Sequence, residues 1–270
     1  MPTIEENRLV WDGSYSWPEG GDEWSRNWGA VAMQWYGTIL PRIYSFLTGG
    51  TILEIGCGYG RWTHYLKDHC ERLLAVDLSQ QCIAACRRRF AGVPHVSFHN
   101  NDGVSLRMIE ADAVDFVFSF DALPLVDDTT MAAYIAQLPR VLKREGVAFL
   151  HHSNLGAYRV WNVLIRRNPR IEMLLQRLGF PERDLHWRDP CVSSKAVCCW
   201  AAAHGLRCVS QETLRWGTRL LSVECLSVLV HQGSSRDREC RRFHNWRFDD
   251  EVANLARLAR LYGGGRVSNP

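Results

Sequence analysis

A glycine-rich stretch follows a strand-like run near the start of the chain. It reads TILEIGCGYGRW over residues 51–62, with Gly56, Gly58 and Gly60 at alternate positions and the carboxylate of Glu54 just before them. Glycine lets the backbone adopt unusual dihedral angles and approach a bound molecule closely. A tight turn of this kind after a parallel strand forms a ligand crevice. The stretch therefore predicts a loop that binds a small molecule.

The spacing of the glycines indicates the kind of ligand. A dinucleotide-binding loop has the form G-x-G-x-x-G, so that a pyrophosphate lies on the following helix. Here the spacing is G-x-G-x-G, and Arg61 occupies the place of the third dinucleotide glycine. The carboxylate of Glu54 would repel a pyrophosphate but attract an ammonium group. The loop therefore favours a ligand that carries an ammonium group.

Two adjacent histidines end a later strand-like run. The stretch FLHHSNLG places His151 and His152 where the chain leaves that run. Histidine exchanges a proton near neutral pH, and the carboxyl edge of the strands carries the site in open α/β sheets. Because successive strand residues point to opposite faces, we expect one of the pair to face the site. His186, in DLHWRDP, is a second candidate.

The segments that would position these residues alternate in type. Strand-like runs cover 51–55, 72–77, 95–100, 114–120 and 146–152, and helix-like segments cover 61–69, 79–90 and 129–143. This alternation predicts a parallel sheet with helices on both faces. Further on, a helix-like segment precedes two strand-like runs, at 206–216 and 220–230. We predict a Rossmann-like α/β fold whose seven-stranded sheet has five parallel strands and an antiparallel pair.

With these motifs the chain resembles the class I S-adenosylmethionine-dependent methyltransferases. LEIGCGYG matches their first motif, E/D-x-G-x-G-x-G, and LLAVDLS, FHNNDG, VDFVFSFDAL and LPRVLKREGVAFL follow in the order of the later strands. The resemblance covers residues 50–152 closely and 193–230 by pattern. It implies that S-adenosylmethionine is the cofactor and that the activity is methyl transfer.

The resemblance also implies which residues hold the cofactor. The glycine loop would pass under its amino-acid part, Asp77 would bind the ribose hydroxyls, and Asp102 would face the adenine amino group. Phe120 and Asp121 would stand at the sulfonium end. The implied cofactor-binding residues are Glu54, Gly56, Gly58, Gly60, Asp77, Leu78, Asn101, Asp102, Gly103 and Phe120.

Two kinds of methyl acceptor are disfavoured by the residues after the fourth strand. FDAL stands where enzymes that methylate exocyclic base nitrogens resemble one another in N/D-P-P-Y/F, and the Pro-Cys of cytosine C5 enzymes has no counterpart there. Cys191, in DPC, follows the fifth strand and is misplaced for that role. A hydroxyl acceptor needs a base. We therefore predict O-methylation with His152 or His151 as the base and Asp121 as a further catalytic residue.

A narrower resemblance points to the acceptor. DEWSRNWG, FSFDAL and HHSNLG look like a bacterial group of sugar O-methyltransferases, such as those of mycobacterial methylmannose polysaccharide biosynthesis. Some sugar O-methyltransferases hold a diol with a divalent metal. Asp121 and His152 are the candidate ligands of Mg²⁺ here, and Asp127 and Asp128 are further ones unless they belong to a solvated loop. The alternatives are a small aromatic or amine acceptor, a catalytically silent cofactor-binding subunit, and RNA methylation.

We divide the chain into three parts. Residues 1–48 form an N-terminal arm, residues 49–235 the methyltransferase domain with an insertion at 153–192, and residues 236–270 a charged tail with a helix. The arm contains Trp11, Trp17, Trp24, Trp28 and Trp35. Two interpretations stay open: the tryptophans form a lid over cofactor and acceptor, or they pack against the domain or a dimer partner. Trp216 and Glu224, near the last strand pair, are weaker candidates for the same face.

Composition bounds the partners. A net charge of +3 over 270 residues does not favour nucleic acid, and the basic runs at 87–89 and 236–247 read as solvated surfaces. No apolar run reaches the length of a membrane span, and the acidic, polar start is not a secretory signal. The ten cysteines lack paired zinc spacing, which favours reduced thiols in the cytoplasm. We predict a small-molecule or oligosaccharide acceptor, with no nucleic acid and no membrane partner, and leave a homodimer open.

Overall fold

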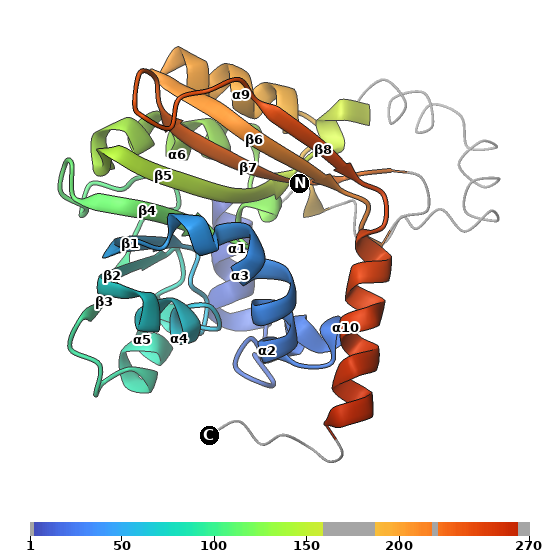
Figure 1. The fold of residues 1–270 in the computed structure, drawn as a ribbon. Coiled ribbons are helices and arrows are strands. Elements are labelled where there is room, and N and C mark those ends of the chain that lie inside the picture. Colours follow the sequence, from blue (N-terminus) through green and yellow to red (C-terminus); the bar gives the residue numbers. More distant parts are fainter. Residues whose placement is uncertain (1–2, 159–186, 218–220, 264–270) are drawn as a thin grey trace.

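The computed structural model describes residues 3–158, 187–217 and 221–263. These ranges hold an eight-stranded sheet with the strand order β3-β2-β1-β4-β5-β7-β6-β8 (Figure 1). The strands are β1 (Gly49–Ile55), β2 (Cys70–Asp77), β3 (Val96–Asn100), β4 (Val114–Ser119), β5 (Leu142–Ser153), β6 (Leu206–Leu214), β7 (Glu224–His231) and β8 (Arg241–Asn245).

The strand directions confirm the predicted Rossmann-like α/β fold. Strands β1 to β5 pair in parallel, and β7 pairs antiparallel with both β5 and β6. The structure adds β8, which pairs in parallel with β6 inside the segment predicted as a charged tail. Four of the five β8 side chains are exposed, so its sequence lacks the apolar alternation by which a half-buried strand is recognised.

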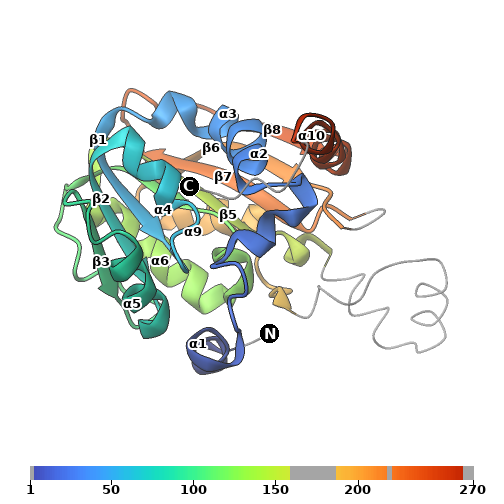
Figure 2. The ribbon, with the colours of Figure 1, turned by 90° about the horizontal axis from the view of Figure 1, so that it is seen from below.

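Helices lie on both sides of the sheet (Figures 1 and 2). The helices are α1 (Ile4–Leu9), α2 (Val31–Gln34), α3 (Leu40–Ile43), α4 (Thr63–Leu66), α5 (Gln80–Arg89), α6 (Asp128–Val141), α9 (Ser194–Ala203) and α10 (Phe248–Tyr262). Short helical turns are η1 (Val10–Ser14), η2 (Asp22–Trp28), η3 (Trp35–Ile39), η4 (Tyr44–Phe46), η5 (Lys67–His69), η6 (Leu123–Leu125) and η7 (Leu155–Tyr158). The Ser79 side chain caps α5 by accepting the amide of Cys82, at the start of the helix-like segment predicted over 79–90.

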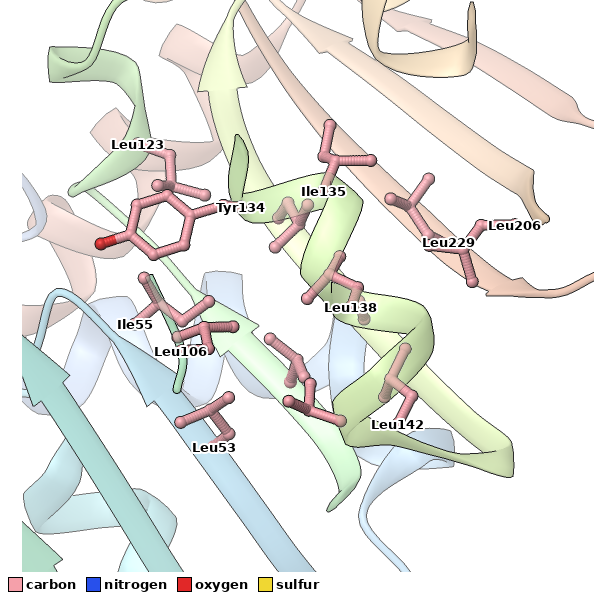
Figure 3. Packing of buried hydrophobic residues seen from close by; sticks show 14 of the residues in the cluster. Leu53, Ile55, Leu106, Leu123, Tyr134, Ile135, Leu138, Leu142, Leu206 and Leu229 are labelled. Atoms are coloured by element: carbon pink, nitrogen blue, oxygen red, sulfur yellow. The ribbon is translucent and has the colours of Figure 1, made fainter. Parts of the chain in front are cut away.

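The core forms two layers, one on each face of the sheet. Leu53 and Val117 pack with α6 and α9 on one face, and Figure 3 shows Leu53 with Leu138 of α6 in this layer. Their neighbours Ile52 and Phe116 pack with the N-terminal helices and α10 on the other face. Strand side chains alternate between faces, so residue parity tells which layer a side chain enters. This parity separates the two histidines at the end of β5.

Part of the N-terminal arm belongs to the core. Trp28 and Trp35 are buried in the layer that also contains α10. The indole Nε1 of Trp28 donates to Thr38 Oγ1 at 2.9 Å, and the Trp35 ring stacks on Tyr65 with centroids 5.1 Å apart. The packing interpretation therefore holds for these two tryptophans.

Two predicted features fall partly or wholly outside the described residues. His186 and most of the insertion predicted at 153–192 lie there. Among the helices that the structure does describe, none combines the length and apolar character needed to span a bilayer.

Candidate functional site

A pocket opens at the carboxyl ends of the parallel strands. It encloses about 1070 Å³, its open mouth included, between the glycine loop, the ends of β2 and β4, the start of α6 and the N-terminal arm. Several residues predicted to bind the cofactor or to act in catalysis line this pocket. They are Gly56, Gly58, Asp77, Leu78, Gly103, Phe120 and Asp121.

The glycine loop adopts a conformation that other residues resist. Gly56, Gly58 and Gly60 have φ values of +77°, +53° and +84°, in the left-handed region that favours glycine. A Cβ added at Gly56 would clash with the side chain of Ala122, and one at Gly60 with the ring of Phe90. The glycines thus allow both the turn and its close packing.

Asp77 links the end of β2 to the glycine loop. Its Oδ2 accepts the Gly58 amide and its Oδ1 accepts the Ser79 amide, both at 2.8 Å. Burial raises the pKa of Asp77 to about 6, although these two amides act in the opposite direction. A carboxylate has room for about four hydrogen bonds, so Asp77 keeps acceptor capacity toward the pocket that it lines.

Glu54 lies beneath the loop and does not line the pocket. It is buried, and its Oε2 accepts the Thr63 hydroxyl at 2.5 Å. Its Oε1 is buried and has no hydrogen-bond partner among the described residues. Burial raises the pKa of Glu54 to about 8. A buried, unpartnered carboxylate oxygen is costly unless a donor or a cation completes it, which suits the predicted ammonium group.

In the turn after β3, one predicted cofactor-binding residue lines the pocket and two others stabilise the turn itself. Asn101 is buried, donates to the Tyr134 hydroxyl at 2.9 Å and accepts the Gly103 amide at 3.1 Å. Asp102 is exposed, and its Oδ1 accepts the amides of Val104 and Ser105 at 3.0 and 2.6 Å. Gly103 lines the pocket, while Asn101 and Asp102 shape the turn behind it.

Asp121 is the acidic residue at the exit of β4, and it belongs to a buried charge network. Its φ is +66°, a strained value for a side-chain-bearing residue. Arg61 Nη2 lies 2.6 Å from Asp121 Oδ2, and His151 Nδ1 lies 3.3 Å from Asp121 Oδ1. On the far side of the ring, His151 Nε2 lies 2.8 Å from Glu224 Oε2, and Arg188 pairs with the other oxygen of Glu224.

This network surrounds His151 with charged and polar partners. The Asp121 amide points at Nδ1 from 3.2 Å, a contact that only a neutral ring can accept. Burial also acts to lower the pKa of His151, but the carboxylates of Glu224 and Asp121 outweigh it and raise the pKa to about 9. The two carboxylates thus favour the imidazolium, whereas the amide contact to Nδ1 suits a neutral ring with its proton on Nε2. In either form the ring is 3% exposed and absent from the pocket lining, so it is not placed to act as the predicted base on an acceptor there.

The pKa values of the two carboxyls beside His151, Asp121 and Glu224, are lowered. Burial acts to raise the pKa of both carboxyls, but Arg61 and His151 hold the pKa of Asp121 below its usual value. His151 and Arg188 lower the pKa of Glu224 to about 2. Asp121 thus faces the pocket as a firmly ionised and weakly basic carboxylate.

His152 points away from the pocket, which corrects its predicted role as base and metal ligand. Its Nδ1 lies 2.7 Å from Ser153 O and its Nε2 lies 2.8 Å from Ser227 Oγ. Burial lowers the pKa of His152 to about 4. Strand alternation puts this side chain on the α6 and α9 face, opposite His151. Asp121 and His152 are therefore not brought together.

The other metal candidates have structural roles. The Asp127 side chain accepts the Thr130 amide at 2.7 Å and caps α6, although Asp127 also touches the pocket. The Asp128 side chain contacts the Thr129 hydroxyl. Cys191, which the sequence already disfavoured as a nucleophile, lies outside the pocket lining. Within the described ranges, no three or more His, Cys, Asp or Glu side chains are arranged to hold a metal ion.

Three of the arm tryptophans form an aromatic wall of the pocket. Trp11, Trp17 and Trp24 line it and contact one another through ring centroids 5.6 and 6.0 Å apart. Trp17 also stacks on Tyr59 of the glycine loop, with centroids 4.5 Å apart. The lid interpretation thus fits these three. Trp216 instead packs on Trp28, 5.1 Å away, within the core.

Polar contacts hold the N-terminal arm, which carries this wall, against the start of α5 and against η6. Asp12 Oδ1 accepts the Ser79 hydroxyl at 2.6 Å and the Gln81 amide at 3.2 Å. On α1, Asn7 Nδ2 donates to Leu125 O at 3.0 Å. The arm therefore closes over the pocket from the ends of α5 and η6.

Arg61 and Arg188 were not identified from the sequence. Arg61 occupies the place of the missing dinucleotide glycine, which is a local signal that the loop holds a charge there. Arg188 had no such signal, because its partner Glu224 is 36 residues away on β7. The weak candidate Glu224 proves to be central to the network.

Comparisons with known proteins agree with this fold. Residues 52–146 match the family described as "Methyltransferase domain". The match begins within β1 and ends within β5, and it includes the glycine loop, Asp77 and Asp121. Over this segment, which is less than half of its length, the chain is similar to a methyltransferase domain.

Individual relatives are distant. Phosphoethanolamine N-methyltransferase 1 of Caenorhabditis elegans is 28% identical over 102 residues, which are 38% of this chain and 21% of that protein. The chain spans between 21% and 38% of the length of the curated relatives it matches.

Solved structures show the same fold. Magnesium protoporphyrin IX methyltransferase of Synechocystis, crystallised with S-adenosylhomocysteine, has a TM-score of 0.56 at 16% identity and covers 84% of this chain and 98% of its own. Geranyl diphosphate C-methyltransferase of Streptomyces coelicolor was crystallised with Mg²⁺, geranyl diphosphate and S-adenosylhomocysteine. It has a TM-score of 0.56 at 13% identity, and the match covers 86% of this chain and 98% of that protein.

Proposed function

We propose that this protein transfers the methyl group of S-adenosylmethionine to a small-molecule acceptor. The observation that carries the proposal is the pocket in which Asp77 and the glycine loop line one wall while an unpartnered oxygen of Glu54 lies beneath the loop. Two of the similar structures contain S-adenosylhomocysteine, the product of that cofactor. These two proteins are named for acceptors as different as a porphyrin and a prenyl diphosphate, so the fold does not specify the acceptor.

The residues present fit this cofactor. Glu54 would receive the ammonium group, and the free acceptor sites of Asp77 would receive the ribose hydroxyls. Leu78 and Gly103 would border the adenine. The cofactor supplies an already activated methyl group, so the protein's own task is to align an acceptor and to exclude water.

Asp121 is the residue that would meet the acceptor. It lines the pocket beside Phe120, but Arg61 and His151 keep it ionised and weakly basic. A weak base can accept a hydrogen bond and orient a nucleophile, yet it removes a proton from an aliphatic alcohol poorly. Asp121 is therefore better suited to positioning an acceptor than to deprotonating a sugar hydroxyl.

We therefore favour an acceptor that is nucleophilic without a strong base, namely a small amine or an ionisable aromatic hydroxyl. The wall formed by Trp11, Trp17 and Trp24 offers flat apolar area to such a molecule. One relative, phosphoethanolamine N-methyltransferase 1 of Caenorhabditis elegans, is named for an amine acceptor. A sugar hydroxyl, for which aromatic stacking would also serve, is the competing acceptor.

The test has two stages. Calorimetric titration with S-adenosylmethionine should show binding that Asp77→Ala abolishes and the exposed-site control Asp68→Ala preserves; equal affinity for both variants would overturn the cofactor assignment. A panel of amines, phenols and sugars should then be assayed for homocysteine-forming turnover, with Mg²⁺ and with chelator. Turnover of amines or phenols in chelator supports the proposal, whereas turnover of sugars that needs Mg²⁺ restores the metal-assisted hydroxyl mechanism. Binding without any turnover indicates a silent subunit.

A further inference from the structure

A second pocket lies beside the segment that follows the glycine loop. It encloses about 700 Å³, its open mouth included. Its walls come from the start of η2, the start of α2, residues 61–67, the end of α5 and the turn after it. Among the described residues, Arg61 alone lines both this pocket and the candidate functional site. The proposed function makes no use of this second pocket.

Basic side chains from separate places converge on the second pocket. Arg61 comes just after the glycine loop, Lys67 from the start of η5, and Arg89 from the end of α5. Among the described residues, Asp22 supplies the one carboxylate of the lining. The cations therefore outnumber the carboxylate. A concave surface with an excess of one sign of charge attracts ligands of the opposite sign, so this pocket favours an anion.

Lys67 and Arg89 keep hydrogen-bond donors for such an anion. Lys67 Nζ lies 2.6 Å from Asp68 Oδ1, but the Asp68 side chain is 67% exposed, and an exposed ion pair of this kind is weak. Arg89 Nη1 donates to Tyr59 O at 2.9 Å. An ammonium group has three N–H donors and a guanidinium has five. Both side chains thus retain donors after these contacts with described residues.

The remainder of the lining offers aromatic and apolar surface. Tyr65 and Phe90 line the pocket together with His64, whose ring packs edge-on against Tyr65 with centroids 4.9 Å apart. Burial, followed by the charges of Lys67 and Arg89, lowers the pKa of His64. The His64 ring is therefore neutral near pH 7 and adds no charge of its own. Rings beside the cations suit an anion that is attached to an organic group better than a free inorganic ion.

We propose that the second pocket binds the phosphate group of a small organic phosphate, mainly through Lys67 and Arg89. A guanidinium can contact two phosphate oxygens at once, and an ammonium group contributes a compact charge. Arg61 already pairs with Asp121 at the candidate functional site, so it would contribute less. The proposal does not rest on methyl transfer, because Lys67 and Arg89 are absent from the lining of the candidate functional site.

The experiment uses the full chain and two probes, phenyl phosphate and inorganic phosphate, each titrated in a calorimeter at low ionic strength. We expect phenyl phosphate to bind more tightly than inorganic phosphate. Lys67→Gln and Arg89→Gln should each weaken the binding of phenyl phosphate by about tenfold, the usual effect of losing a hydrogen bond from a charged group. Arg88→Gln is the matched control, because Arg88 is the exposed neighbour of Arg89 on α5 and lines neither pocket. This variant loses the same charge and should keep the wild-type affinity.

Three results would overturn the proposal. One is the absence of any heat of binding from either probe. Another is an equal loss of affinity in Arg88→Gln and Arg89→Gln, which would indicate attraction by overall charge alone. The third is tighter binding of inorganic phosphate than of phenyl phosphate, which would indicate a site for a free ion. Circular dichroism checks that each variant is folded, and Lys67→Gln and Arg89→Gln test the pocket independently of each other.

Discussion

Nε2 of His151 lies 2.8 Å from Oε2 of Glu224, and Nδ1 of the same ring lies 3.3 Å from Oδ1 of Asp121. The buried ring of His151 thus lies between two carboxylates and joins β7 to Asp121 at the pocket. The ring holds Asp121 in place and is not available to take a proton from a substrate. Under the proposed function, His151 is a positioning residue instead of the predicted base, and Asp121 is the group that would meet the acceptor.

Replacing Asp121 tests its role at the acceptor. Under the proposed function, Asp121→Asn should lower kcat by about 10²-fold or more, because an oriented carboxylate is lost from the reaction centre. The affinity for S-adenosylmethionine should change far less. Asp128→Asn, seven residues further on α6, is the matched control and should keep its turnover. Unchanged turnover in Asp121→Asn would remove Asp121 from the mechanism.

Breaking the network at Glu224 should destabilise the protein. Glu224→Gln removes one partner of a buried ion pair, which costs about 3–5 kcal/mol in the free energy of unfolding. The exposed Glu239→Gln is the control. Equal unfolding midpoints in denaturant for Glu224→Gln and wild type would contradict the network.

The stability that this pair provides depends on pH. The pKa of Glu224 is lowered to about 2 from a usual 4.5, so its contribution is present above pH 4.5 and is lost as pH falls. The pKa of His151 is raised from 6.5 to about 9, so its contribution is complete below pH 6.5 and is lost as pH rises through 9. The difference between wild type and Glu224→Gln should therefore be largest between pH 4.5 and 6.5, which denaturation across pH can measure.

Glu54 should have the opposite effect on stability. Burial raises its pKa from 4.5 to about 8, so the folded state holds the proton more tightly and stability falls as pH rises over that interval. Glu54→Gln should match wild type near pH 4.5 and exceed it above pH 8, on the order of a few kcal/mol. The same variant should bind S-adenosylmethionine more weakly. An unaltered pH profile, equal to that of the exposed control Glu110→Gln, would argue against the buried charge.

Two tryptophans of the arm should respond differently to removal. Trp28 is 5% exposed and its indole is hydrogen-bonded, so Trp28→Ala should lower the free energy of unfolding by about 3–5 kcal/mol. Trp17→Ala should alter thermal stability much less and raise KM for cofactor or acceptor several-fold, because Trp17 lines the pocket and stacks on Tyr59. If Trp17→Ala leaves both KM values unchanged, the aromatic wall does not contact the ligands.

The elements that the sequence predicts well are those with local signals. The apolar strands, the glycine turn, the Ser79 cap and the acidic end of β2 each depend on residues within a few positions of one another. The sequence could not reveal β8 in the same way, because its exposed polar side chains give no periodicity and only backbone pairing with β6 defines it.

By itself, then, the sequence determined the class of fold and the loop that would hold the cofactor, because spacing and strand periodicity are read along the chain. Only the tertiary structure decided the state of each charged group. His151 and His152 are identical neighbours, yet one is held between two carboxylates and the other between Ser153 and Ser227 on the opposite face. Burial lowers the pKa of His152, whereas Glu224, 73 positions away, and Asp121 raise the pKa of His151.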